Sequence, residues 1–260
     1  MQEDLNPGPA GKRRRPLTMG SPQLGAFLTI PNTYSAEIMT RAGWDILIID
    51  MQHGAADYSD ALTMLQIMSL GTVQRWVRVP SLDSDLIGRM LDAGAEGIIA
   101  PMVETADDVE RLVRACTYPP RGQRSFGPLR PALTEDMTAY GASANDRILP
   151  IAMIETAAAL EHLDDILSVD GLGAIYVGPT DLGISLGLPA AVNREDEVFE
   201  AALANIVERA ASRGVPVCMH ANSLAYAKRM VGRGFAMVTA CADSELLGGG
   251  SNMMLTELRG

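Results

Sequence analysis

The sequence has few lysines and few cysteines, and each shortage argues against a kind of chemistry. Its lysines are Lys12, near the N-terminus, and Lys228, inside a helical segment. Schiff-base aldolases and pyridoxal-phosphate enzymes need a lysine at a strand end, so neither mechanism is favoured. The cysteines, Cys116, Cys218 and Cys241, are odd in number and too widely spaced for a disulfide framework or a CxxC metal site. We therefore expect reduced thiols in a cytoplasmic protein.

The sequence also lacks the features of nucleic-acid-binding, secreted and membrane proteins. Its formal net charge of -11 leaves no broad basic face for a phosphate backbone. The N-terminal segment is polar and has no apolar core of the kind that a secretory signal needs. No later apolar run approaches the length of a bilayer crossing, and no GxSxG elbow or Walker loop is present. We predict a soluble protein that binds neither nucleic acid nor membranes.

Aliphatic residues, in contrast, are plentiful. Of the 260 residues, 47% are apolar although only four are Phe and two are Trp, which predicts one large aliphatic core. Residues 1–18 are rich in Pro, Gly and charge and are predicted to form a flexible arm. The domain is therefore expected to span residues 19–260. The basic run from Lys12 to Arg15 lies in the arm, and we assign it no role.

Eight apolar runs alternate with helical segments after the arm. The runs are LGAFLTI, DILIID, QRWVRVP, EGIIAPMV, LPIAMIE, GAIYVG, VPVCMH and FAMVTA. Buried parallel strands read as continuous apolar segments separated by helices, so the pattern predicts a single (β/α)8 TIM barrel. An open doubly wound sheet is the alternative, but no glycine-rich dinucleotide loop follows the first run. Residues 117–146, before the fifth run, are expected to be an inserted loop.

Acidic residues follow two neighbouring strands of the predicted barrel. Glu155 ends the fifth run, and Asp181 lies in the turn GPTDLG after the sixth. Active sites of such barrels lie at the carboxyl ends of the strands, so both carboxylates could bind one divalent cation, Mg²⁺ or Mn²⁺. Either acid alone could instead cap a helix. Without a cation the two charges would repel, and one acid would have to take up a proton.

A histidine and an arginine occupy two other strand ends. His53, in IDMQHG, is a candidate general base or proton shuttle, with a satisfied rim histidine as the alternative. Arg78, in WVRVP, is a candidate clamp for a substrate carboxylate, with a buried salt bridge as the alternative. We expect His162 at the surface. His220 either lines the pocket or fills the rim.

Several motifs occur in the order and spacing of a known family. They are IDMQHG, VRVP, LDAGAEGIIAPMVET, YPPRGQRSFG, AMIET and VGPTDLGISLG. They resemble the HpcH/HpaI family of hydroxy-oxo-acid aldolases over nearly all of the sequence after the arm. The resemblance implies class II, metal-dependent cleavage of a 4-hydroxy-2-oxo acid into an aldehyde and pyruvate or a close analogue. It also implies a homo-oligomer, often a hexamer with exchanged terminal helices.

The resemblance further implies how this family's metal and substrate would be held. By position in the motifs, Glu155 and Asp181 look like ligands of Mg²⁺ or Mn²⁺, with Co²⁺ as a further option. Arg78 looks like the group that binds the oxo acid. Gly178, Thr180 and Asp181 look like the turn that binds the substrate carboxylate, since the start of a helix offers free backbone N–H groups.

The remaining catalytic roles fall on a pair of residues far apart in the sequence. His53 looks like the catalytic histidine of the family, and Asp92, in LDAGA, looks like its matching carboxylate. Asp92 is predicted at the end of a helix, on the face of the barrel opposite the strand ends. We therefore expect that Asp92 either pairs with His53 of a neighbouring subunit or serves only the helix end, with Gly94 as its cap.

Two positions depart from the family pattern. Many relatives have Gln where this sequence has Met153, and many have Glu where it has Gln52. The choice of oxo acid and aldehyde therefore stays open. Related decarboxylating synthases and CoA-thioester lyases, which share the two-acid metal site, remain alternatives. So does a non-catalytic protein that only binds an oxo acid.

Overall fold

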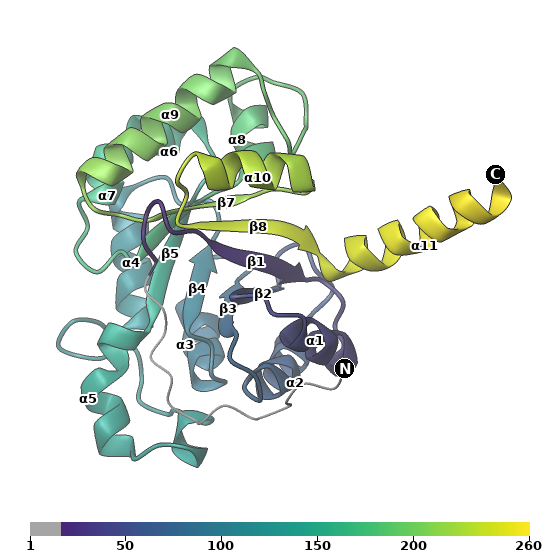
Figure 1. Cartoon of the computed structure of the whole chain (residues 1–260). Coiled ribbons are helices and arrows are strands. Elements are labelled where there is room, and N and C mark those ends of the chain that lie inside the picture. The colour runs from purple at the N-terminus through teal and green to yellow at the C-terminus, as the bar shows by residue number, and fades with distance from the viewer. Residues whose placement is uncertain (1–16) are drawn as a thin grey trace.

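Residues 17–260, which the computed structural model describes, contain a closed barrel of eight parallel strands (Figure 1). The strands pair in sequence order, and β8 closes onto β1. They are β1 (Gln23–Leu28), β2 (Ile46–Asp50), β3 (Gln74–Arg78), β4 (Gly97–Ala100), β5 (Leu149–Ile154), β6 (Ala174–Val177), β7 (Val217–His220) and β8 (Met237–Ala242). Each lies within or overlaps one of the eight apolar runs. The predicted (β/α)8 barrel is confirmed, and the open sheet is wrong.

Helices follow every strand and surround the barrel. Asp57 accepts from the N–H of Asp60 while Asp60 accepts from the N–H of Asp57, a reciprocal pair that fixes the start of α2. The helices are α1 (Thr33–Arg41), α2 (Tyr58–Met68), α3 (Ser84–Asp92), α4 (Ala106–Cys116), α5 (Met137–Arg147), α6 (Ala157–Glu161), α7 (Leu163–Leu167), α8 (Pro179–Ser185), α9 (Glu197–Ser212), α10 (Leu224–Gly232) and α11 (Asp243–Arg259). The predicted arm falls almost wholly outside the described residues, and Lys12 to Arg15 does so entirely.

The segment 117–146 is not the plain loop that the sequence led us to expect. It contains the 3-10 turn η1 (Pro131–Leu133) and most of α5. The carboxylate of Asp136 accepts from the N–H of Ala139 and starts α5. The helix buries Tyr140 and Ala144 against Tyr118. So narrow an apolar face gives little helical periodicity, which is why the pattern did not reveal the helix.

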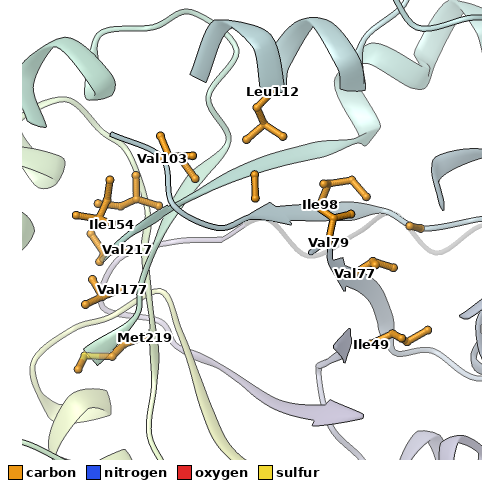
Figure 2. Packing of buried hydrophobic residues seen from close by; sticks show 14 of the residues in the cluster. Ile49, Val77, Val79, Ile98, Val103, Leu112, Ile154, Val177, Val217 and Met219 are labelled. Atoms are coloured by element: carbon orange, nitrogen blue, oxygen red, sulfur yellow. The ribbon is translucent and has the colours of Figure 1, made fainter. Parts of the chain in front are cut away.

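Strand side chains alternate between two apolar layers. Ile49 and Val77 point outward, where they join the cluster that packs under the helices, including Leu112 of α4 (Figure 2). Ile48 and Trp76 point inward and join a second cluster inside the barrel. Gly97 makes room for Trp76, because a Cβ at Gly97 would lie 2.8 Å from its indole ring. The two layers hold the strand ends in fixed positions.

Helix α11 differs from the others because it extends away from the barrel (Figure 1). Asp243, its first residue, is its one buried residue. Six large apolar side chains along it are exposed, namely Leu246, Leu247, Met253, Met254, Leu255 and Leu258. Within residues 17–260, no helix combines the length and the apolar character that a membrane crossing requires.

Candidate functional site

An ion pair between the ends of β2 and β3 forms one side of the barrel mouth. Asp50 and Arg78 are partners in the strand register. Arg78 Nε donates to Asp50 Oδ1 at 2.9 Å, and Nη2 donates to Oδ2 at 2.6 Å. The carboxylate also accepts from the backbone N–H groups of Gln52 and His53. Burial alone would raise the pKa of Asp50, but Arg78 and the two N–H groups hold it below its ordinary value.

The salt bridge that the sequence left open for Arg78 is therefore present. It occupies one edge of the guanidinium, while Nη1 makes no hydrogen bond within residues 17–260. The guanidinium carbon lies 4.7 Å from the centre of the Phe27 ring, and 12% of the side chain is exposed. Arg78 thus keeps a donor for a ligand while Asp50 holds it in place. Sequence reasoning counted Asp50 among the polar residues at the strand ends but gave it no role, although it ends the buried run ILIID of β2, next to β3.

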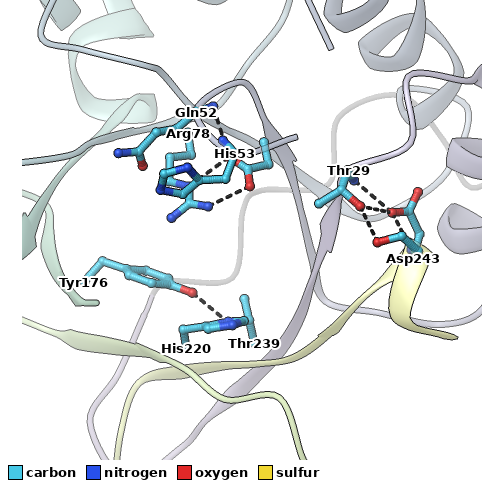
Figure 3. Close-up of polar contacts among 10 residues, drawn as sticks. Thr29, Gln52, His53, Arg78, Tyr176, His220, Thr239 and Asp243 are labelled. Carbon is cyan, nitrogen blue, oxygen red and sulfur yellow. Dashed lines mark hydrogen bonds and ion pairs between the residues drawn. The ribbon is translucent and has the colours of Figure 1, made fainter. Parts of the chain in front are cut away.

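His53 lies on the tight turn that follows β2. A Cβ at Gly54 would come within 2.2 Å of the Asp50 carbonyl oxygen, so only glycine allows the chain to pass this close. His53 is exposed, and its ring makes no hydrogen bond within the described residues. Figure 3 shows His53 with Gln52 and Arg78 on the same side of the mouth. The ring is accessible to a ligand there.

The predicted acid pair lies at the end of β5 and in the first turn of α8. Glu155 directly follows β5, is 2% exposed and accepts from the N–H of Met102 at 2.7 Å. Asp181 is exposed and lies in the first turn of α8. Burial and then the charge of Asp181 raise the pKa of Glu155, although the N–H of Met102 and Arg78 oppose this. The alternative capping roles are wrong, because Thr156 caps α6 and Gly178 precedes α8.

The space beside Glu155 depends on a glycine. A Cβ at Gly178 would lie 2.5 Å from Glu155 Oε2 and 3.0 Å from Met153 Cε. Gly178 and Thr180 begin the turn into α8, where the first N–H groups have no partners within the helix. Within residues 17–260 no group of three or more His, Cys, Asp or Glu residues is arranged to hold a metal. A cation here would have two protein carboxylates and open positions, as Mg²⁺ commonly has.

A hydrogen-bonded chain of three side chains lies inside the barrel below the mouth. His220 Nδ1 is 2.9 Å from Thr239 Oγ1, which is 2.7 Å from the Tyr176 hydroxyl (Figure 3). The ring of His220 meets the Phe27 ring edge-on at 5.3 Å. Burial, and then the charge of Arg78, lower the pKa of His220 to about 4. His220 thus lies in the barrel interior, and whether it lines the pocket or fills the rim stays a prediction. His162 is exposed, as expected.

Asp92 lies away from the mouth, at the last residue of α3. It forms an ion pair at 2.7 Å with Nη2 of Arg124, whose side chain is fully buried. Burial raises the pKa of Asp92 although Arg124 opposes this. Gly94, with a φ of 103°, ends the helix as predicted. No contact joins Asp92 to His53 within the described chain, so a single copy does not bring this predicted pair together.

Comparisons with known proteins match the chain over nearly its whole length. Residues 23–247 match the family model described as HpcH/HpaI aldolase/citrate lyase. A hydroxypyruvate/pyruvate aldolase from Rhizorhabdus wittichii is 39% identical over 240 residues, covering 92% of this chain and 95% of that protein. A 4-hydroxy-2-oxovalerate aldolase from Rhodococcus jostii is 34% identical over 92% of each. The crystal structure of an HpcH/HpaI aldolase/citrate lyase family protein from Burkholderia cenocepacia superposes with a TM-score of 0.87 at 29% identity, covering 93% of this chain and 96% of that one.

Proposed function

The chain belongs to the HpcH/HpaI aldolase/citrate lyase family, and we propose from this that it cleaves and forms 4-hydroxy-2-oxo acids. It is a carbon–carbon lyase, and its products are an aldehyde and pyruvate or a close 2-oxo acid such as hydroxypyruvate. The curated relatives named above carry the names of such aldolases. The observation that carries the proposal is a buried carboxylate, Glu155, beside a second acid, Asp181, in a barrel mouth that also holds Arg78.

Glu155 and Asp181 are the proposed ligands of a divalent cation, Mg²⁺ or Mn²⁺, with Co²⁺ as a further option. The residues fit such an ion. Glu155 is buried next to a like charge, and Gly178 leaves space beside its Oε2, so a cation would remove the cost of the unpaired charge. When bound, the ion supplies Lewis-acid polarisation of the substrate 2-oxo group.

Arg78 orients the substrate and balances its charge. With Nε and Nη2 held by Asp50, Nη1 is the donor that remains for an oxygen of the oxo acid. Negative charge develops on the 2-oxo oxygen as the C3–C4 bond breaks, because the electron pair of that bond forms the C2–C3 double bond of an enolate. A fixed guanidinium in a site with little water stabilises this charge without having to reorient. The turn from Gly178 through Thr180 to Asp181 offers backbone N–H groups to the substrate carboxylate.

His53 is the proposed base. Its exposed ring removes the C4 hydroxyl proton as the C4 carbonyl of the aldehyde forms, and the same proton can later return to C3 to give the oxo acid. Asp92 is the proposed partner of this ring across a subunit boundary, in a homo-oligomer for which a hexamer is favoured. Two observations support that assembly: Asp92 makes no contact with His53 within residues 17–260, and α11 carries exposed apolar side chains.

Turnover tests this proposal against its alternatives. Purified protein with Mn²⁺ is mixed with a generic 4-hydroxy-2-oxo acid, and pyruvate is followed by coupling to lactate dehydrogenase. The proposal predicts catalytic pyruvate release. Binding of pyruvate by calorimetry without any release would favour a non-catalytic oxo-acid-binding protein. Reaction only with oxaloacetate or with a CoA thioester would favour the decarboxylating or thioester-cleaving branch of the family.

A further inference from the structure

His220 lies near the proposed active site but has no role in the proposed reaction. It is the last residue of β7 and the register partner of Thr239 on β8. Its ring and the Arg78 guanidinium both lie against the Phe27 ring. Figure 3 shows His220 and Tyr176 on the side of the barrel interior across from His53 and Arg78. His220 is therefore an interior group close to the substrate-binding arginine.

The hydrogen bonds around Thr239 favour one position for the proton on the ring of His220. Tyr176 is 1% exposed, and its hydroxyl contacts only Thr239 Oγ1 within the described residues. If Thr239 donated to Tyr176, the phenolic hydrogen would be buried without an acceptor, which is costly. Tyr176 must therefore donate to Thr239.

Thr239 then has its own hydroxyl hydrogen to place. The two acceptors within reach are His220 Nδ1 at 2.9 Å and the Met219 carbonyl oxygen at 3.4 Å. Either tautomer of His220 keeps the 2.9 Å contact, so the choice depends on where the Thr239 hydrogen goes. At 3.4 Å the bond to Met219 is longer than an ordinary O–H···O bond, so we place the hydrogen toward His220 Nδ1, which accepts it. Because burial keeps the imidazole neutral near neutral pH, its one hydrogen is on Nε2.

The Nε2–H group makes no hydrogen bond with the protein within residues 17–260. Nε2 is also not one of the buried polar atoms of these residues that lack a hydrogen-bond partner. It is therefore an accessible donor on a half-buried ring. Inside the same barrel, Met153 is 1% exposed and apolar and offers no competing donor.

We propose that His220 determines oxo-acid specificity by donating Nε2–H to a hydroxyl group on C3 of the substrate. The inference rests on the proposed aldolase function. In the proposed function, the carboxylate and the 2-oxo group of the substrate are bound by Arg78, the acid pair and the turn before α8. In a three-carbon oxo acid, C3 is then the remaining part that can contact His220 at the end of β7. The methyl group of pyruvate cannot accept a hydrogen bond, whereas the hydroxyl of hydroxypyruvate can. A neutral donor makes this distinction without competing with Arg78 and the turn before α8 for the charged oxygens of the substrate.

The kinetic test compares hydroxypyruvate with pyruvate as the oxo acid, using one aldehyde. In His220→Leu the ratio of the two kcat/KM values should fall by about three- to tenfold, the effect of one neutral hydrogen bond. His220→Gln keeps a side-chain N–H and should recover most of the ratio. His162→Leu, a surface control, should leave the ratio at the wild-type value. An unchanged ratio in His220→Leu overturns the proposal.

Two further measurements do not depend on turnover. Long-range ¹H–¹⁵N spectra of histidine-labelled protein should show His220, one of three histidines, as the neutral Nε2–H tautomer, and Thr239→Val should weaken that preference. Calorimetry without aldehyde should show wild type preferring hydroxypyruvate to pyruvate and His220→Leu losing the preference. A dominant Nδ1–H tautomer, or equal affinities in wild type, overturns the proposal even if both acids react. Loss of the aldolase function would instead appear as absence of turnover with a preserved tautomer and preference.

Discussion

Two buried acids at the barrel mouth, Asp50 and Glu155, have opposite effects on the stability of the fold. Asp50 is buried but satisfied, because Arg78 and two backbone N–H groups bind its carboxylate. Glu155 is buried, accepts from the backbone N–H of Met102 and lies near the like charge of Asp181. Acids of the first kind stabilise the fold, and acids of the second kind are retained at a cost in stability for what they bind.

Replacing Asp50 with Asn should lower both stability and activity. The change removes the charge that holds Arg78, so the free energy of unfolding should fall by about 1–3 kcal/mol. Because the pKa of Asp50 is lowered in the folded state, its contribution is full at neutral pH and is lost as pH falls through that pKa. Urea unfolding of both proteins, from neutral pH down to about pH 2.5, should show the difference shrinking with acid. Equal midpoints at neutral pH would contradict this role.

Replacing Glu155 with Gln should have the opposite effect on the stability of metal-free protein. Its pKa is raised in the folded state, so the folded chain binds the proton more tightly and loses stability as pH rises above the ordinary value of the acid. Glu155→Gln should therefore unfold at a higher temperature than wild type at neutral pH, while pyruvate release should fall by at least about two orders of magnitude. Scanning calorimetry with and without Mg²⁺ provides the check. Mg²⁺ should stabilise wild type only, and equal stabilisation of both proteins would be evidence against this site.

At the scale of strands and helices, glycines fix how closely two elements approach. Gly178 joins β6 to α8 and leaves the space that a side chain would take from Glu155 Oε2. The sequence predicted this turn because Gly178 and Pro179 interrupt an apolar run. The sequence could not show that a Cβ at Gly178 would meet the carboxylate of Glu155, because this contact lies between the ends of the neighbouring strands β5 and β6.

Gly178→Ala should therefore damage the site more than the fold. The added methyl would overlap Glu155 Oε2 and crowd Met153, so we expect a loss of at least about tenfold in kcat/KM and about 1–3 kcal/mol in stability. Gly232→Ala is the matched control, since nothing lies within 4 Å of a Cβ there and α10 should gain up to about 1 kcal/mol. Steady-state kinetics and urea unfolding of both variants give the comparison. A fully active Gly178→Ala would show that the space is not needed.

Strands were the most predictable elements, for a physical reason. Most are buried along nearly their whole length, so they appear as apolar runs such as ILIID, and the polar residue that ends the run marks the mouth. The ends of these runs identified Glu155 and Arg78 as candidate site residues. The Asp50–Arg78 pair and the chain from Tyr176 to His220 depend on register between strands far apart in sequence. Helix α5 was missed because it buries only two residues.

At the scale of the whole molecule, two features have no evident role in a single copy of the chain, namely helix α11 and Asp92. Helix α11 projects from the barrel with apolar side chains exposed (Figure 1). Asp92 lies beside the buried Arg124 and lines a hollow of about 650 Å³ between α3, α4 and the segment that follows α4. Both fit the proposed homo-oligomer, in which α11 covers a partner subunit and Asp92 reaches its His53.

Subunit mixing tests this arrangement. His53→Ala and Asp92→Ala should each be nearly inactive alone, because each lacks one member of the pair. When they are dissociated and reassembled together, some sites receive both groups and part of the activity should return. Native mass spectrometry confirms that subunits have exchanged. No recovery after confirmed exchange would contradict pairing between subunits, and a fully active Asp92→Ala would show that there is no pair.

The central claim is that Glu155 and Asp181 form a metal-dependent site for carbon–carbon cleavage. Its most direct test is pyruvate release from a 4-hydroxy-2-oxo acid by chelator-treated protein, measured before and after Mn²⁺ is restored. Wild type should lose its activity on chelation and recover it with Mn²⁺. Asp181→Asn, which leaves the turn before α8 intact, should stay at least about two orders of magnitude lower in both conditions. Full activity in chelated wild type, or in Asp181→Asn, would contradict the claim.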